Sequence, residues 1–120
     1  MASLAHILIV DDNPGVRDVI QVLLAENGFR VSGAGDLVEA RQILAGTPPV
    51  DLVILDATLA GERGAALAGD ARDLAIPVIM MTGDPASRDS VETSGLPYIF
   101  KPFHIEDLLK LVRDTLRLVG

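Results

Sequence analysis

The sequence of 120 residues contains no cysteine and no long apolar run. Without cysteine the chain has no disulfide framework and no thiolate metal site, which agrees with a reducing compartment. No apolar run approaches the roughly 20 residues that a membrane-spanning helix needs. The first mostly apolar stretch, Leu4 to Val10, has no basic segment before it and stops at Asp11, so it is not a signal peptide. We therefore expect a cytoplasmic protein without a membrane span.

Positive charge is also scarce. The chain has ten Lys and Arg against seventeen Asp and Glu, a net charge of −7. The basic residues are scattered and form no stripe that a phosphate backbone would bind, so direct nucleic-acid binding is disfavoured. Only two of them are lysines, Lys101 and Lys110.

What the chain does contain is five short apolar runs that alternate with helix-period segments. The runs, each predicted as a strand, cover residues 6–10, 29–34, 51–56, 76–82 and 97–100. Three of them are nearly continuous Val, Ile, Leu and Met, which is typical of strands covered on both faces. Helices are predicted from Pro14 to the cap at Asn27-Gly28, over 36–45, 63–73 and 86–93, and from Ile105 to Leu116. The order predicts a single α/β domain over residues 1–120, with a parallel sheet, right-handed crossovers and helices on both faces.

Polar side chains follow four of the five predicted strands. The first strand runs into Asp11 and Asp12, the third ends at Asp56, the fourth at Thr82, and the fifth is followed by Lys101. The second strand brings only Gly33-Ala34-Gly35, as an outermost strand would. Because ligands bind outside the carboxyl ends of parallel strands, these ends form the candidate site.

Each of these residues alone has an ordinary structural explanation. Asp11, Asp12 or Asn13 could cap the helix that begins at Pro14. Asp56 could begin a loop, Thr82 could belong to a turn, and a lysine is usually a solvated surface charge. The joint pattern favours a functional site, because unrelated caps and turns would not bring three acids, a hydroxyl and one of two lysines to one edge of a sheet.

Such a cluster suits phosphoryl chemistry. Three neighbouring carboxylates repel one another unless a cation joins them, and hard oxygen ligands with room for water suit Mg²⁺ or Mn²⁺. A lysine and a hydroxyl opposite the metal would hold an anion. Phosphoryl transfer to a carboxylate nucleophile needs little more than this.

The motifs resemble the receiver domain of bacterial response regulators, the CheY-like domain of two-component signalling. They are ILIVDDNP, LVILD, VIMMTG and YIFKPF, in this order, and GFRVSGAGDLVEA resembles the family's second strand and helix. The resemblance implies a doubly wound, flavodoxin-like (βα)5 domain with strand order 2-1-3-4-5. It also implies a regulator that is not an enzyme, apart from promoting its own phosphorylation and autodephosphorylation.

The resemblance assigns roles in phosphorylation. Asp56 would accept a phosphoryl group from a phosphohistidine on a sensor histidine kinase or a histidine phosphotransfer protein. Asp12, Asp56 and the backbone carbonyl of Thr58 would bind Mg²⁺, and Asp11 would hold a metal-bound water.

The resemblance also implies a two-state switch. Lys101 and the Thr82 hydroxyl would contact the phosphoryl oxygens, and Gly83 would leave the site open. Tyr98 would be the aromatic switch residue, and the Lys101–Pro102 peptide bond is expected to be cis. A downstream effector would read the face formed by the fourth helix, fifth strand and fifth helix, and the resemblance allows for a homodimer on activation.

The loop after Asp56 departs from the family pattern. Ala60 replaces a usual proline, and Arg63 stands where an acid is common. These changes would loosen the loop or bring Arg63 to the partner or the acidic site. Thr58 and Asp84 occupy the positions that tune autodephosphorylation in the family.

Three other readings compete with a phosphorylated receiver. A receiver-fold interaction module that is never phosphorylated is disfavoured by the intact set of acids, hydroxyl and lysine. A haloacid-dehalogenase-type phosphatase would need Asp-x-Asp, whereas Asn13 stands two residues after Asp11. A dinucleotide-binding domain is weaker still, because Val38 stands where the third glycine of its motif belongs.

Overall fold

The chain folds into a five-stranded parallel sheet with helices on both faces. The computed structural model describes residues 4–59 and 61–119, and their side chains except at 61–65 and 118–119. The strands are β1 (His6–Val10), β2 (Arg30–Ala34), β3 (Leu52–Asp56), β4 (Val78–Thr82) and β5 (Tyr98–Phe100), in the order β2-β1-β3-β4-β5. The helices are α1 (Pro14–Glu26), α2 (Leu37–Ala45), α3 (Gly61–Asp73), α4 (Arg88–Glu92) and α5 (Ile105–Val119), with 3-10 turns η1 (Ala57–Leu59) and η2 (Pro85–Ser87). The predicted flavodoxin-like fold and strand order are confirmed.

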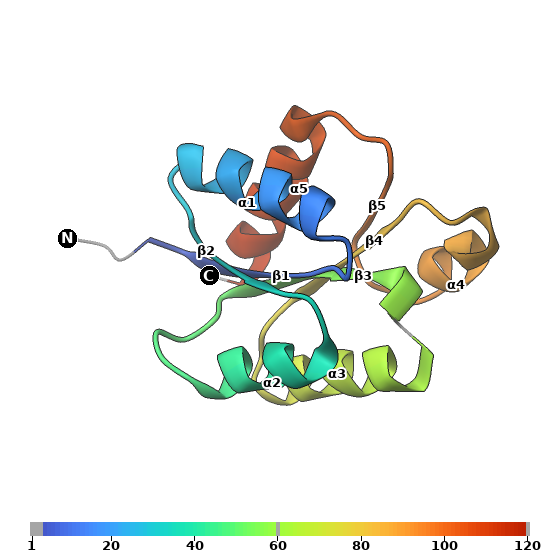
Figure 1. The fold of residues 1–120 in the computed structure, drawn as a ribbon, viewed down its shortest axis with the longest axis horizontal. Coiled ribbons are helices and arrows are strands. Elements are labelled where there is room, and N and C mark those ends of the chain that lie inside the picture. Colours follow the sequence, from blue (N-terminus) through green and yellow to red (C-terminus); the bar gives the residue numbers. More distant parts are fainter. Residues whose placement is uncertain (1–3, 60, 120) are drawn as a thin grey trace.

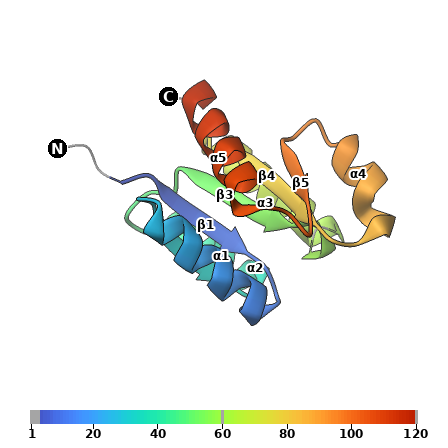
Figure 2. The same cartoon turned by 90° about the horizontal axis from the view of Figure 1, so that it is seen from above.

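The helices form two layers around the sheet. Helices α1 and α5 cover one face, and α2 and α3 cover the other (Figure 1). Seen from above, α4 lies beside β5 at the edge of the sheet (Figure 2). The edge position predicted for β2 is confirmed, and β5 is the opposite edge.

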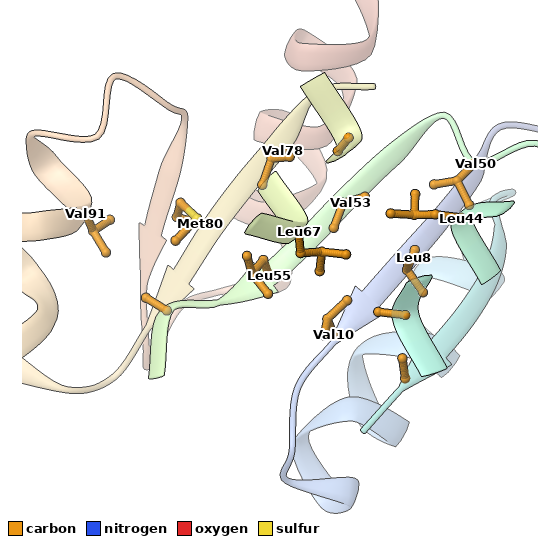
Figure 3. Close-up of a cluster of buried hydrophobic side chains, with 14 residues drawn as sticks. Leu8, Val10, Leu44, Val50, Val53, Leu55, Leu67, Val78, Met80 and Val91 are labelled. Atoms are coloured by element: carbon orange, nitrogen blue, oxygen red, sulfur yellow. The ribbon is translucent and has the colours of Figure 1, made fainter. Parts of the chain in front are cut away.

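The core follows from the alternation of side chains along buried strands. Every residue of β1, β3 and β4 is buried. Successive side chains point to opposite faces, so Leu8 and Val10 pack under α2 and α3, while Ile7 and Ile9 pack under α1 and α5. Figure 3 shows the first of these clusters.

Several predicted element boundaries were wrong by one to three residues. Proline lacks an N–H, so β4 and β5 begin after Pro77 and Pro97, whose carbonyls still accept hydrogen bonds from the neighbouring strands. The third helix begins at residue 61 rather than 63, and the last continues to 119. The predicted helix 86–93 is split into η2 and the shorter α4, because Asp84 caps the turn at Pro85 by accepting from the Ala86 amide (3.0 Å).

A buried histidine closes the end of the sheet opposite Asp56. The Nδ1 of His6 donates toward the carbonyl oxygens of Pro48 and Pro49 (3.1 and 3.2 Å), and its Nε2 accepts from the Ser32 hydroxyl (2.7 Å). The backbone amide of His6 donates to the Asp51 carboxylate (2.7 Å). These contacts tie β1 to β2 and to the loop before β3.

Among the described residues, no helix combines the length and apolar character needed to cross a membrane.

Candidate functional site

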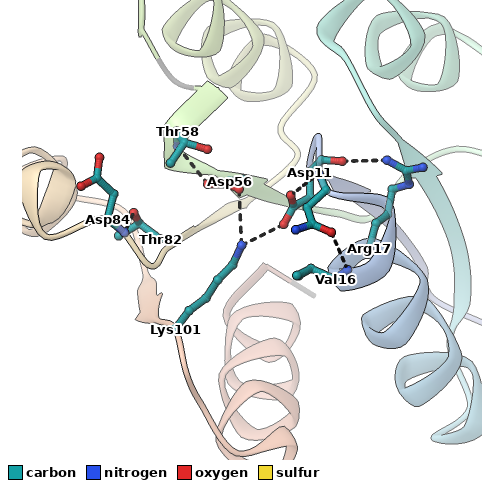
Figure 4. A network of polar contacts seen from close by, with 9 residues as sticks. Asp11, Val16, Arg17, Asp56, Thr58, Thr82, Asp84 and Lys101 are labelled. Carbon is teal, nitrogen blue, oxygen red and sulfur yellow. Dashed lines mark hydrogen bonds and ion pairs between the residues drawn. The ribbon is translucent and has the colours of Figure 1, made fainter.

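The site lies at the carboxyl ends of four strands. Asp56 is the last residue of β3 and Thr82 the last of β4, while Asp11 follows β1 and Lys101 follows β5 (Figure 4). Asp11, Asp56 and Thr82 are almost fully buried, whereas Asp12 is exposed. The cluster predicted from strand ends is therefore assembled in space, with Asp12 on its open side.

Three carboxylates converge in this cluster. One oxygen each from Asp11, Asp12 and Asp56 lies within 4.8 Å of the others. Thr58 belongs to the same corner: its amide donates to Asp56 Oδ1 (2.9 Å) and fixes the orientation of that carboxylate. An all-oxygen set that is partly open to solvent fits a hard divalent cation such as Mg²⁺. The Thr58 carbonyl remains a predicted ligand.

Lys101 supplies positive charge to this anionic corner. Its Nζ lies 2.9 Å from Asp11 Oδ2 and 3.4 Å from Asp56 Oδ2. Partial burial alone would lower the pKa of the ammonium, but its hydrogen bond to Asp11 and the charges of Asp56 and Asp11 outweigh burial, and the Lys101 pKa is raised. The predicted cis Lys101–Pro102 bond is confirmed; Thr47–Pro48 is also cis, which the sequence did not indicate.

Gly83 gives Lys101 its room. A Cβ at this position would lie 3.2 Å from Lys101 Cβ, closer than ordinary van der Waals contact. The family resemblance implied that Gly83 leaves the site open. In the structure the close neighbour is the stem of the lysine that bridges the two acids.

Thr82 takes part in the turn that leads to α4. Its hydroxyl accepts from the Asp84 amide (3.1 Å), and the Asp84 carboxylate accepts in turn from the Ala86 amide and, at 3.4 Å, from the Ser87 hydroxyl. Thr82 thus belongs both to the turn and to the site. Its hydroxyl is linked through Asp84 and Ser87 to the start of α4.

Tyr98 stands on the neighbouring face formed by α4, β5 and α5. It is 41% exposed, and its ring centroid lies 5.3 Å from that of Phe100. The guanidinium of Arg88 on α4 lies over the Phe100 ring, with its carbon 4.3 Å from the ring centroid. This contact between a cation and an aromatic ring connects α4 to β5.

The capping explanation for the acidic pair is partly correct. Asn13 caps α1 by accepting from the Val16 amide (3.1 Å), as expected, but Asp11 Oδ1 also accepts from the Asn13 amide (2.9 Å). Asp11 thus stabilises the loop and faces the site.

One residue near the site was missed. Arg17 Nη1 donates to the backbone carbonyl of Asp11 (2.8 Å), and nothing in the spacing of its helix indicated this contact. Of the two departures in the loop, Ala60 and the side chain of Arg63 lie outside the part of the chain that the structure describes.

Comparison with known proteins decides the family. Residues 7–113 match the response regulator receiver domain. The chain belongs to this family. The receiver domain is 35% identical over 98% of its length to PetR of Rhodobacter capsulatus, covering 51% of that protein. It spans about half the length of the curated relatives it matches.

Solved structures agree with this assignment. A CheY-like receiver domain from Methanospirillum hungatei is 30% identical, with a TM-score of 0.83 over 98% of this chain and 97% of that one. TrrA of Thermotoga maritima, solved in complex with Mg²⁺-BeF, is 28% identical, with a TM-score of 0.78 over 93% and 99%. Membership of the receiver-domain family excludes the phosphatase and dinucleotide-binding alternatives.

Proposed function

We propose that Asp56 is the phosphoacceptor of this receiver domain and takes a phosphoryl group from a phosphohistidine. The donor is a sensor histidine kinase or a histidine phosphotransfer protein, and the reaction takes place in the cytoplasm. The observation that supports this best is the Lys101 ammonium, held between Asp11 and Asp56 inside an acidic cluster. Such an arrangement stabilises an added phosphoryl group, whose negative charge needs a fixed cation.

The cluster fits Mg²⁺ or Mn²⁺. Asp11, Asp12 and Asp56 offer converging oxygens, and the Thr58 carbonyl is the proposed fourth protein contact, with Asp11 acting through a water. When bound, the metal would neutralise the carboxylates and the incoming phosphoryl oxygens. Relatives bear on this only by analogy: TrrA was solved with Mg²⁺-BeF.

The chain's own residues supply the remainder of the reaction. An Asp56 oxygen forms the new bond to phosphorus as the bond from phosphorus to the donor's histidine nitrogen breaks and its electron pair returns to the imidazole. The Thr58 amide holds one Asp56 oxygen in place. Lys101 stabilises the charge on the transferred group.

Phosphorylation would then act on the switch residues. The phosphoryl group adds a charge of about −1.5 to −2 and three strong acceptors. It would attract the Thr82 hydroxyl as a donor and weaken the bond that this hydroxyl accepts from the Asp84 amide. Because Asp84 caps the turn before α4, the change would reach Tyr98 and the face formed by α4, β5 and α5, where an effector or a second copy would bind.

The donor must cover the surface next to Lys101 to bring its histidine to Asp56. A groove begins there, between α1 and the segment after β5, and Val16, Val19, Pro102 and Phe103 contribute to its lining. Val19 is 58% exposed although it is apolar. We place the donor's docking contact on this groove, because its lining is mostly apolar and includes Lys101 of the reacting site.

Labelling with a small phosphodonor tests the phosphoacceptor. With acetyl phosphate and Mg²⁺, the wild type should gain the mass of one phosphoryl group, Asp56→Asn should gain none, and a chelator should abolish labelling. Asp114→Asn, an exposed change on α5 far from the site, is the control and should label fully. An unlabelled wild type contradicts the proposal and favours the interaction module that is never phosphorylated. Equal labelling of Asp56→Asn contradicts the assignment of Asp56 as the phosphoacceptor.

The rate at which the phosphoryl group is lost tests the proposal that the chain promotes only its own phosphorylation and dephosphorylation. Decay of phosphorylated wild type should be intrinsic to the chain, and changes at Thr58 or Asp84 should alter its rate. Small phosphate esters should not be turned over. Steady hydrolysis of such esters would show an enzyme rather than a regulator.

A further inference from the structure

Arg17 holds the peptide group that joins the two acids of the first strand end. Its side chain is half-buried on α1, and its Nη1 donates to the carbonyl oxygen of Asp11 at 2.8 Å. That carbonyl belongs to the Asp11–Asp12 peptide. Figure 4 shows the guanidinium on the side of Asp11 that faces away from Lys101. Arg17 therefore acts on the backbone of the acidic pair from outside the site.

Asp11 is held at every polar atom. Its amide donates to the Ala34 carbonyl (3.1 Å), its carbonyl accepts from Arg17, and its two carboxylate oxygens accept from the Asn13 amide and Lys101. The exposed Asp12 differs, because its side chain makes no hydrogen bond or ion pair with any other described residue. The direction in which the Asp12 side chain leaves the backbone is consequently set by the preceding peptide group, whose carbonyl Arg17 holds.

Gly35 leaves the space that the guanidinium occupies. A Cβ on Gly35 would lie 3.0 Å from Arg17 Nη1 and 3.7 Å from Arg17 Cζ. Unlike Gly28 and Gly95, Gly35 does not have a positive φ, so its backbone would accept alanine. Room for Arg17, rather than backbone conformation, is what this glycine provides.

We propose that Arg17 is a positioning residue for the metal site, seated by Gly35, and that it presets Asp12 for Mg²⁺ by fixing the Asp11–Asp12 peptide. This rests on the proposed Mg²⁺ site. Arg17 forms no ion pair among the described residues, so it acts through geometry rather than by neutralising a carboxylate. Its positive charge, if it acted alone, would weaken the binding of a cation.

Calorimetric titration of the metal-free wild type and variants with Mg²⁺ tests the inference. Arg17→Ala should weaken Mg²⁺ binding about tenfold, the low end of the range for residues that orient metal ligands. Gly35→Ala should weaken binding by less, because its methyl only displaces the guanidinium. Combining the two should give no further loss beyond Arg17→Ala, since both act through one contact.

The chain offers a matched control at the same helix–strand contact. A Cβ on Gly33 would clash with Gln21 Oε1, one helical turn beyond Arg17, and Gln21 makes no hydrogen bond to Asp11. Gly33→Ala should therefore perturb the packing of α1 on β2 without changing Mg²⁺ affinity. Arg17→Lys, which keeps a donor and the charge, should recover part of the affinity.

The outcomes separate geometry, charge and the metal site itself. Equal or tighter Mg²⁺ binding by Arg17→Ala overturns the inference, as does equal weakening by Gly33→Ala, which would indicate a packing effect. A wild type that binds no Mg²⁺ overturns the metal site and this inference together. A wild type that binds while all variants match it overturns the inference alone.

Discussion

At the scale of single residues, one ammonium serves two buried acids. Lys101 contacts both Asp11 and Asp56 before any ligand arrives, and the same side chain is the proposed contact for the phosphoryl group. The free domain thus holds its cation in place before reaction, and little reorganisation is needed when phosphate arrives.

This pairing predicts a pH dependence of stability in the metal-free domain. The Lys101 pKa is raised in the folded state, so the folded protein binds the proton more tightly than the unfolded chain. The stabilisation is complete below the ordinary value of 10.5 and is lost as pH rises through the folded pKa. Urea unfolding between pH 9 and 11 should show a falling free energy of unfolding.

The variant Lys101→Met isolates this contribution. Its free energy of unfolding should be lower at pH 9 and should fall less steeply toward pH 11 than that of the wild type, since only the wild type has the Lys101 ammonium to deprotonate. Parallel slopes for the two proteins would contradict a coupling between Lys101 and the acids.

Some site residues could be predicted from sequence, and the reason is periodicity. Asp56, Thr82 and Lys101 stand where apolar runs end, and in a parallel sheet those ends meet. Arg17 and Gly35 could not be found this way, because their contact joins a helix side chain to the backbone just after an edge strand, and neither periodicity nor spacing predicts that contact. Resemblance supplied the roles, and the comparisons established the family.

At the scale of elements, the strands were easier to predict than the helix ends. Buried strands show as uninterrupted apolar runs, whereas η2 and the shortened α4 depend on the Asp84 cap and Pro85, a local competition that a hydrophobic pattern does not register. The elements that move in a switch are drawn from such weakly packed segments. Helix α4, with Val91 its only buried residue, fits that description.

Helix α1 carries a prediction about the donor. Replacing Val19 with Asp should slow phosphotransfer from a phosphohistidine protein that labels the wild type by about tenfold or more, because an exposed apolar contact worth about 1.4 kcal/mol is lost. Labelling by acetyl phosphate should stay unchanged. Rates from quenched-flow gels with the protein donor and from mass spectra with acetyl phosphate measure both.

Val38→Asp is the matched control for this experiment. Val38 is an exposed valine on α2, on the opposite face of the sheet, and it is 70% exposed. It should leave both reactions unaffected. Equal slowing by the two variants, or slowing with acetyl phosphate as well, would argue against a docking contact on α1.

At the scale of the whole molecule, the sheet has a hydrophobic cluster on each face and the three carboxylates of the proposed metal site at one end. Because these carboxylates come together only in the folded state, Mg²⁺ should stabilise the fold by mass action. The expected gain is about 2.7 kcal/mol at a concentration 100 times its dissociation constant. Urea unfolding with and without Mg²⁺ measures this. Asp12→Asn should lose most of the gain, yet be no less stable than the wild type without metal, because the Asp12 side chain has no partner among the described residues.

A wild type whose unfolding midpoint does not move with Mg²⁺ would contradict the metal site.

We also propose that residues 1–120 form one receiver domain, since the described strands and helices share the two faces of one sheet. Cooperative unfolding in a single transition is the expected result.

The His6 contacts at the far end of the sheet give the molecule a built-in asymmetry. There, a buried imidazole fastens two strands and a loop with bonds that no proposed ligand touches. At the other end, Asp11 after β1 and Asp56 at the end of β3 are the side chains whose partners would change when a ligand binds. The His6 contacts thus hold the strands in alignment at one end of the sheet, while phosphorylation can rearrange the side chains at the carboxyl ends of the strands.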